Sequence, residues 1–207
     1  MNAWGDRVWG VYTQRLRLRL PRPADAIALS RLMTPGISAR LASWPAFLSP
    51  SDARLRIEQG LAAFSASELM PMLITCRRDE TVLGWISIAL DAATPTSGIM
   101  TYWLGDAHQG SGVMREAAPA ARDAGFTWLN LSAIRAAVQP DNAASRSVLR
   151  GVGMRLLGTG SIWCAPRGRE EGCEWWGVSA PAMLPSLHGL GDSASPTAPQ
   201  LGAGLAD

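Results

Sequence analysis

The stretch YWLGDAHQGSGVMREA, residues 102–117, combines the features that decide the fold. An apolar, strand-like run ends in a polar turn that contains Gly105, Gly110 and Gly112, and a helix-like run follows. The N–H groups of a helix's first turn have no partners within the helix, and together with the helix dipole they form a site for anions. Glycines at 110 and 112 remove side chains that would keep a bulky phosphate away from these amides. The alternative is a tight turn that binds nothing, and the glycine spacing alone does not decide between the two.

Apolar residues on both sides of this stretch recur with the periods of strands and helices. The predicted strands are 14–20, 70–76, 81–90, 98–104, 131–139, 154–163 and 173–180. The predicted helices are 23–33, 49–64, about 111–124 and 142–153. This order predicts an α/β fold in which a mixed sheet carries helices on its faces. We expect one domain over residues 13–181, an N-terminal extension over 1–12, and a low-complexity, mobile C-terminal tail over 182–207.

Composition argues against several classes of function. The net charge of +2 on 207 residues is too small to favour nucleic-acid binding. The three cysteines, Cys76, Cys164 and Cys173, form no CxxC pair, so we predict neither a disulfide framework nor a metal site. The N-terminus lacks the continuous apolar run of a signal peptide, and no apolar stretch of about 18 residues could span a membrane. We therefore expect a cytoplasmic protein without a membrane partner; the sequence does not indicate its oligomeric state.

Four segments of the chain resemble the GNAT superfamily, the acyl-CoA-dependent N-acyltransferases. QGSGVM, residues 109–114, resembles the family's pyrophosphate loop, with Gln109 and Gly112 at the matching positions. DNAASRSVLRGVGM, residues 141–154, resembles its second signature, an Asn, a Ser three residues later and a short helix that ends in Gly. QRLRLRLPRPADA (14–26) and ASWPAFLSPSDA (42–53) resemble segments of the ribosomal-protein alanine and serine N-terminal acetyltransferases. The resemblance implies a single GNAT-like domain, with a mixed central sheet of about six to seven strands flanked by about four helices.

The resemblance also implies where acetyl-CoA binds as the co-substrate. It places the cofactor in a V-shaped split between residues 98–104 and 131–138, where unpaired backbone groups contact the pantetheine. The residues that would contact the cofactor are Tyr102, Trp103, Leu104, Gln109, Gly110, Ser111, Gly112, Val113, Met114 and Asn142. Met114 departs from the family's pattern, which has Gly or Ala there. Asn142 has the alternative role of a helix N-cap, for which Asn is a preferred residue, and both roles can hold together.

The implied reaction is direct attack of a neutral amine on the thioester. At pH 7 about a tenth of protein α-amines are already neutral, because their pKa is near 8, so such an acceptor needs only a weak base. Ser145 matches the serine of the second signature, and we predict that it stabilises the departing thiolate; the alternative is that it only orders the start of its helix. No base is predicted, because residues 154–169 contain no Asp or Glu. Candidates elsewhere are Glu58, Asp91, Asp106 and Glu174, and for each the alternative is a solvated charge.

The resemblance implies a primary amine as the acceptor, either a protein N-terminus or a small molecule, and the motifs do not separate these two. Trp44 and Phe47 would form one wall of its site, with a buried aromatic plug between two helices as the alternative. The competing hypothesis for the whole chain is a CoA-binding module without turnover. A further expectation concerns Pro119, which lies inside the helix after the glycine turn: we predict a kink near residues 115–119, or a helix that ends there and restarts.

Overall fold

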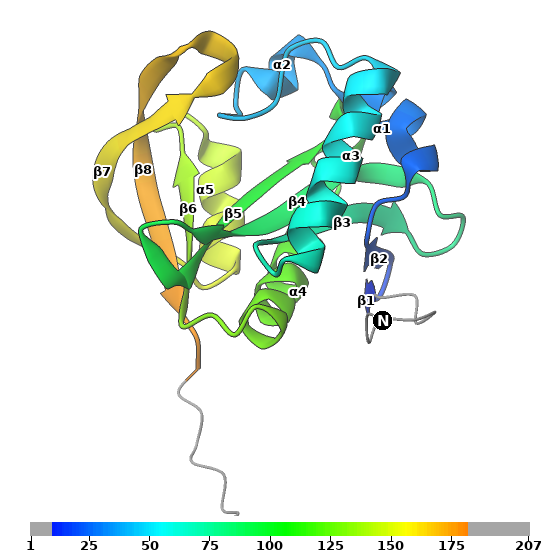
Figure 1. Ribbon diagram of the computed structural model, residues 1–207. Helices are drawn as coiled ribbons and strands as arrows, with labels where there is room; N and C mark the ends of the chain where they lie inside the picture. The colour runs from blue at the N-terminus through cyan, green and yellow to red at the C-terminus, as the bar shows by residue number, and fades with distance from the viewer. Residues whose placement is uncertain (1–9, 182–207) are drawn as a thin grey trace, which may run out of the picture.

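The computed structural model describes residues 10–181, which fold around one eight-stranded sheet (Figure 1). The spatial order of its strands is β1-β2-β3-β4-β5-β6-β8-β7. The strands are β1 Gly10–Tyr12, β2 Leu16–Arg19, β3 Leu69–Cys76, β4 Val82–Asp91, β5 Thr94–Leu104, β6 Ala133–Val138, β7 Arg155–Cys164 and β8 Arg169–Ser179. β5 and β6 pair in parallel, and the other neighbours pair antiparallel. The predicted mixed α/β sheet is confirmed.

The eighth strand is β1, which sequence reasoning did not find. It lies inside the segment that we expected to be an N-terminal extension and pairs with β2, with Val11 opposite Leu18. Three residues are too few to show the period-two alternation by which strands are recognised in a sequence. The rest of that extension, and the C-terminal tail predicted over residues 182–207, lie outside the described residues.

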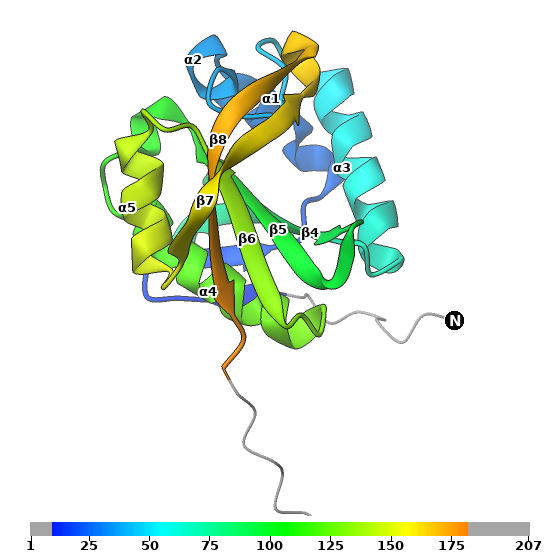
Figure 2. The same ribbon diagram turned by 90° about the vertical axis from the view of Figure 1, so that its left-hand side faces the viewer.

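The helices form one layer on each face of the sheet (Figure 2). They are α1 Ala26–Leu32, α2 Pro35–Ser38, α3 Pro50–Ser65, α4 Val113–Trp128 and α5 Ala143–Gly151, with short 3-10 turns η1 Pro23–Asp25, η2 Asp106–His108 and η3 Ala165–Arg167. The four predicted helices all form, and α2 is additional. α4 and α5 pack on one face around a core that includes Ile86 and Leu149. α1, α2 and α3 pack on the other face, around Leu29, Ile57 and three tryptophans.

The start of α3 shows how local sequence produces these elements. Ser49 is its N-cap: the Ser49 hydroxyl accepts a hydrogen bond from the Asp52 amide at 3.1 Å, and the Asp52 carboxylate accepts one from the Ser49 amide at 3.4 Å. Pro50 occupies the first helical position, where its missing N–H costs nothing. Ala53, Ile57 and Gly60 follow at helical spacing and turn toward the sheet, where all three are buried.

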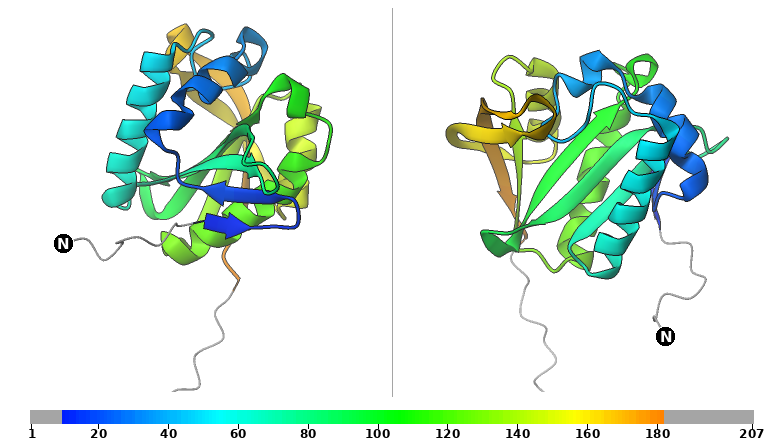
Figure 3. Two further views of the ribbon diagram at one scale, coloured as in Figure 1. Left: turned by 90° about the vertical axis from the view of Figure 1, so that its right-hand side faces the viewer. Right: turned by 45° about the horizontal axis from the view of Figure 1, so that its top comes forward.

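β5 and β6 separate after only three paired positions, and this divergence creates the site (Figure 3). Ser97, Gly98 and Ile99 pair with Ala133, Ile134 and Arg135. Beyond Ile99, β5 continues along β4 as far as Leu104, whereas β6 continues along β8. Backbone groups of residues 100–104 and 136–138 that face each other therefore have no strand partner across the gap. We call this divergence the fork.

The helix after the glycine turn is continuous through Pro119. α4 runs without interruption from Val113 to Trp128, so the alternative that the helix ends near residues 115–119 and restarts is wrong. Pro119 has no N–H for the carbonyl of Arg115, which therefore loses its helical donor. Ala117, Ala118 and Ala121 are fully buried against the first core and hold this part of the helix close to the sheet. A bend of the helix axis at this point stays a prediction.

We expect Pro119→Ala to stabilise the protein by about 1–3 kcal/mol, because alanine restores the missing donor and removes the clash of the proline ring in a continuous helix. The free energy of unfolding, measured by urea denaturation, checks this. Acetyl-CoA affinity serves as the control and should not change, because the glycine turn precedes the substituted position. A loss of stability would contradict the prediction and would show that the packing is adapted to the proline.

Candidate active site

The fork holds a cavity of about 670 Å³, which is within the size range of small-molecule sites. Its walls come from the ends of β5 and β6, the turn before α4, the first turns of α4 and α5, and the segment 36–43 around α2. Every residue predicted to contact the cofactor except Ser111 lies among the lining residues, and Ser145 does so too. Residues that are far apart in the sequence therefore meet in one cavity.

The turn before α4 depends on its glycines. Gly110 and Gly112 have φ of 72° and 78°, in the left-handed region that other residues rarely adopt. The Ser111 hydroxyl donates to the carbonyl of His108 at 2.9 Å, which turns this side chain back onto the loop. The Gln109 side chain donates to the carbonyl of Leu104 at 3.2 Å and so ties the turn to the end of β5. These hydrogen bonds fix the conformation of the turn, and its two glycines leave the backbone before α4 uncovered by side chains.

The side chains of Val113 and Met114 point into the first core and are 7% and 6% exposed. Met114, the departure from the family's pattern, therefore fills core volume instead of standing over the turn. The amides of the first turn of α4 have no partners within the helix, as in any helix. Together with the helix dipole they give this end of the cavity a partial positive charge.

A cation beside the turn was missed by sequence reasoning. Arg15 donates from Nε to Glu116 at 2.7 Å and from Nη1 to the carbonyl of Ser111 at 3.3 Å. Its other terminal nitrogen lies 3.5 Å from the position that a Cβ would take at Gly112. The alternation of residues 14–20 predicts Arg15 inside a strand, whereas β2 begins one residue later, and only the fold shows which element Arg15 faces.

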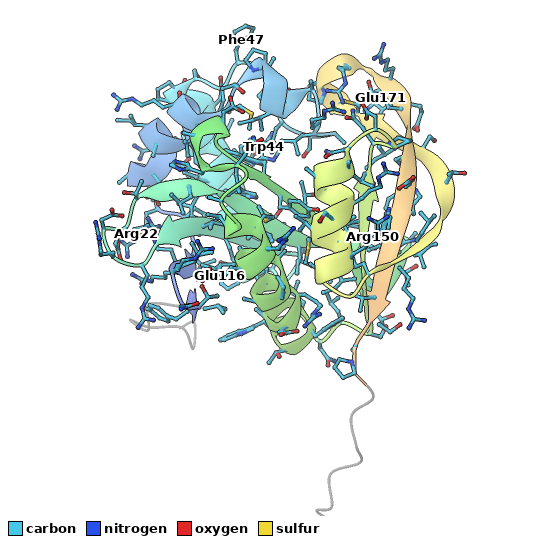
Figure 4. The ribbon with its side chains drawn as sticks, turned by 180° about the vertical axis from the view of Figure 1, so that it is seen from behind. Arg22, Trp44, Phe47, Glu116, Arg150 and Glu171 are labelled. Atoms are coloured by element: carbon cyan, nitrogen blue, oxygen red, sulfur yellow. The ribbon has the colours of Figure 1, made fainter. Side chains whose placement is uncertain are left out.

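Glu116 connects the turn between β1 and β2 to the first turn of α4 (Figure 4). Its carboxylate accepts from the Thr13 hydroxyl at 2.5 Å, from the Arg15 amide at 2.7 Å and from the Arg15 guanidinium. Burial acts to raise the pKa of Glu116, but these hydrogen bonds outweigh it, and the pKa lies below its ordinary value. The carboxylate is therefore charged at neutral pH and holds Arg15 beside the turn.

Ser145 is held by two neighbours on different elements. The Asn142 side chain caps α5 by accepting from the Ser145 amide at 3.0 Å, so the predicted N-cap role is present. The Tyr102 hydroxyl lies 2.7 Å from Ser145 Oγ. Burial raises the pKa of Tyr102 to about 12, and its hydrogen bond to Ser145 opposes this only in part, so the phenol keeps its proton at neutral pH.

Of the four candidate bases, Asp106 reaches the cavity. It is the one carboxylate among the lining residues that the structure describes, and it accepts from Thr34 at 3.0 Å and from Gln109 at 3.3 Å. The other three carboxylates pair with arginines elsewhere: Glu58 with Arg54, Asp91 with Arg135 and Glu174 with Arg146. None of these three lies among the lining residues, so Asp106 is the described carboxylate that faces the cavity.

Trp44 and Phe47, predicted as a wall of the acceptor site, are not among the lining residues. Trp44 is 2% exposed and packs edge-on against Trp85 and Trp103, with ring centroids 5.4 and 5.0 Å apart. Phe47 is 83% exposed and points away from the molecule (Figure 4). The alternative of a buried aromatic plug describes Trp44 but not Phe47, because the Phe47 side chain is largely exposed.

Residues 36–43, which we call the roof segment, line the cavity on the side of α2. Arg40 Nη1 donates to both carboxylate oxygens of Asp141 at 2.7 Å, which fastens the roof segment to the loop before α5. Arg167 donates to the carbonyls of Ser38 and Leu41 at 3.1 and 3.2 Å, which fastens the roof segment to the β7–β8 hairpin.

No helix among residues 10–181 is long and apolar enough to cross a membrane.

Comparison with known proteins identifies the arrangement. The family profile described as "Acetyltransferase (GNAT) domain" matches residues 15–155. This chain belongs to the GNAT acetyltransferases. The match covers the glycine turn, the fork and the α5 signature, and it confirms the family, the enzyme class and the fold that the motifs predicted.

Individual GNAT proteins are similar to this chain along most of its length. The uncharacterized N-acetyltransferase p20 of Bacillus licheniformis is 27% identical over 148 residues, which is 72% of this chain and 83% of p20. A ribosomal-protein alanine acetyltransferase from Vibrio fischeri has a TM-score of 0.68 at 23% identity, covering 86% of this chain and all of that one. The microcin self-immunity acetyltransferase MccE, solved with acetyl-CoA and AMP, has a TM-score of 0.70 at 21% identity, covering 81% of this chain and 94% of MccE.

Proposed function

We propose that this GNAT protein transfers the acetyl group of acetyl-CoA to a primary amine, either a protein N-terminal α-amine or the amine of a small molecule. One observation carries the proposal: a single cavity joins a glycine turn at a helix N-terminus, a strand end without a partner on the β6 side and the half-buried hydroxyls of Tyr102 and Ser145. These three features correspond to the three parts of the donor, which are a pyrophosphate, an amide-bearing arm and a thioester. MccE, which shares the fold, was solved with acetyl-CoA bound.

The donor fits the fork from one end to the other. The pyrophosphate would lie on the amides from Gly110 to Met114, with Arg15 adding positive charge at the edge. The pantetheine amides would pair with the backbone of residues 100–104, which has no strand partner on the β6 side. Asn142 and the start of α5 would bound the arm from the other side. This arrangement directs the thioester toward Tyr102 and Ser145.

The reaction needs stabilisation of the oxyanion, an acceptor for the proton of the amine, and stabilisation of the departing thiolate. The neutral amine forms a bond to the thioester carbon, and a backbone N–H in the fork stabilises the oxyanion. The carbon–sulfur bond breaks, its electron pair goes to sulfur, and the nitrogen loses its extra proton to solvent. Because a thiol with a pKa near 8.5 is a good leaving group, one hydrogen bond from Ser145 is enough to stabilise the thiolate. The one carboxylate among the described lining residues, Asp106, already accepts hydrogen bonds from Thr34 and Gln109, so an α-amine, whose pKa is near 8, suits the site better than a lysine.

The acceptor side of the cavity is formed by the roof segment and the tip of β7. Ile37, Leu41, Ala42 and Ile162 make it largely apolar, and Arg40 is already paired with Asp141. An amine carried on an uncharged, apolar group fits this lining. The fold is shared by an acetyltransferase for ribosomal protein and by the microcin self-immunity enzyme MccE, so both a peptide and a small molecule are retained as acceptors.

Release of CoA thiol from acetyl-CoA, measured against a panel of short peptides and small amines, tests the proposed function. We expect turnover with at least one acceptor that has an α-amine, and slower turnover with lysine side chains. Lysine-blocked peptides provide the control, because they leave the α-amine as the single nucleophile. Binding of acetyl-CoA without thiol release on any acceptor would favour the competing hypothesis of a CoA-binding module.

We expect Ser145→Ala to lower kcat by about tenfold while the KM for acetyl-CoA changes less than twofold, because the serine hydroxyl acts mainly on the charge that develops on sulfur. Steady-state kinetics with a saturating acceptor check this. Ser147→Ala is the matched control, since Ser147 also lines the cavity on α5, whereas the Tyr102 phenol is hydrogen-bonded to Ser145. Unchanged kcat in Ser145→Ala would leave this serine with a structural role alone.

A further inference from the structure

The environment of Ser145 Oγ differs from that of several other serines in this protein, of which three serve for comparison. Ser30, Ser38 and Ser111 each donate their hydroxyl hydrogen to a backbone carbonyl, at 2.7, 2.7 and 2.9 Å. Within residues 10–181, the hydrogen-bond partner of Ser145 Oγ is the Tyr102 phenol at 2.7 Å. A serine early in a helix often donates to a carbonyl three or four residues back, whereas the Ser145 hydroxyl is paired with a side chain of another element.

We propose that Tyr102 is a positioning residue for the transfer step: its phenol donates to Ser145 Oγ and so leaves the serine's own hydrogen free to point at the sulfur of the thioester. The proposal rests on the proposed acetyl transfer. A serine hydroxyl has one hydrogen and two lone pairs, so a donor on the oxygen decides where that hydrogen can point. If Ser145 donated to Tyr102 instead, it would have no hydrogen left for the sulfur.

The pair is held by rigid elements on both sides. Tyr102 lies in the interior of β5, directly opposite Ile86 of β4, and its ring packs against the first core. Ser145 lies in the first turn of α5, where the Asn142 cap holds its amide. The same phenol also reaches the Ser145 carbonyl at 3.3 Å, a longer contact than the one to Oγ. The two side chains therefore meet without either having to move.

The phenol acts as a fixed donor and not as the acid of the reaction. Burial raises its pKa to about 12. A released CoA thiolate, with a thiol pKa near 8.5, is too weak a base to take that proton. In the step itself the amine nitrogen bonds to carbon, the sulfur leaves with the electron pair, and the nitrogen's proton goes to solvent. Tyr102 and Ser145 keep their protons throughout and supply hydrogen bonds alone.

The experiment compares Tyr102→Phe, Ser145→Ala and the double variant. Tyr102→Phe should lower kcat about fivefold to tenfold with little change in the KM for acetyl-CoA, as expected for the loss of one hydrogen bond. The double variant should match Ser145→Ala, because the phenol acts only through the serine. Tyr12→Phe is the matched control: Tyr12 is the other tyrosine of the chain, lies on β1 and is 57% exposed. Thermal unfolding of all variants excludes a loss of fold.

A second readout needs no acceptor. The pKa of the thiol of bound CoA, followed by the ultraviolet absorbance of its thiolate, should rise in all three variants and stay unchanged in Tyr12→Phe. Tyr102→Phe that lowers kcat equally with and without Ser145, or that leaves the thiol pKa unchanged, would overturn the proposal. If the wild-type protein released no thiol with any amine, the proposed function would fail, and the thiol pKa would still decide the role of Tyr102.

Discussion

Gly112→Asp is expected to weaken acetyl-CoA binding by about 100-fold or more. The substitution places a carboxylate at the entrance of α4, where the pyrophosphate would lie, and two like charges brought that close cost several kcal/mol. The effect comes from charge, because the nearest atom to a Cβ at this position is an Arg15 nitrogen at 3.5 Å and the side chain has room. The left-handed backbone, with φ of 78°, tolerates Asp better than most residues.

Two controls separate charge from shape and from backbone strain. Gly112→Asn has the same shape and the same tolerance of positive φ, and we expect it to lose less than about tenfold in affinity. Gly168→Asp places the same side chain at another left-handed glycine, with φ of 60° and open space around it, in the turn between β7 and β8. It should bind acetyl-CoA like the wild type. Calorimetric titration decides the matter, and equal affinities of the Asp and Asn variants at 112 would remove the charge argument.

The second large effect is expected on stability. Arg19 and Asp25 form a bidentate pair with both N···O distances at 2.8 Å, and their side chains are only 4% and 11% exposed. Asp25 also accepts from the Arg22 amide at 2.6 Å. Removing one member of a buried pair leaves the other charge without compensation, which costs about 3–5 kcal/mol. Asp25→Ala should therefore lower the free energy of unfolding by about that amount in urea denaturation.

A matched double variant and a pH series test the cause. In Arg19→Met/Asp25→Leu the charges are replaced together, so most of the lost stability should return. Burial acts to raise the pKa of Asp25, but the hydrogen bonds from Arg19 and Arg22 outweigh it, so the pKa in the folded state lies below its ordinary value of 3.8. The carboxylate therefore stabilises the fold above that pH, and this contribution is lost as the pH falls through the lowered pKa. A single variant that loses less than about 1 kcal/mol would contradict the argument.

The parts of the site that are continuous in the sequence could be predicted from it. The glycine turn needs positive φ at 110 and 112, and only glycine adopts that readily. Glycine at these two positions therefore indicates the backbone conformation of the turn. Asn142 before a helical run is a recognisable cap. The strands and helices carry periodic apolar patterns, and their order leads to a mixed sheet with helices on both faces.

The parts that depend on long-range contacts could not be predicted. The hydrogen bond between Tyr102 and Ser145 joins residues 43 positions apart, and no pattern in the sequence indicates that the two side chains meet. Trp44 and Phe47 look alike as apolar aromatics, yet one is buried and the other is exposed, because only Trp44 faces the tryptophans of β4 and β5. The roof segment lines the cavity through hydrogen bonds from Arg167, more than 120 positions away.

A crystal structure of this protein with acetyl-CoA tests the central claim most directly. The account predicts the pyrophosphate on the amides of residues 110–114, the pantetheine between β5 and β6 beyond Ile99, and the thioester sulfur within hydrogen-bonding distance of Ser145 Oγ. Acetyl-CoA bound outside the fork, or a fork closed by pairing of residues 100–104 with 136–138, would contradict it.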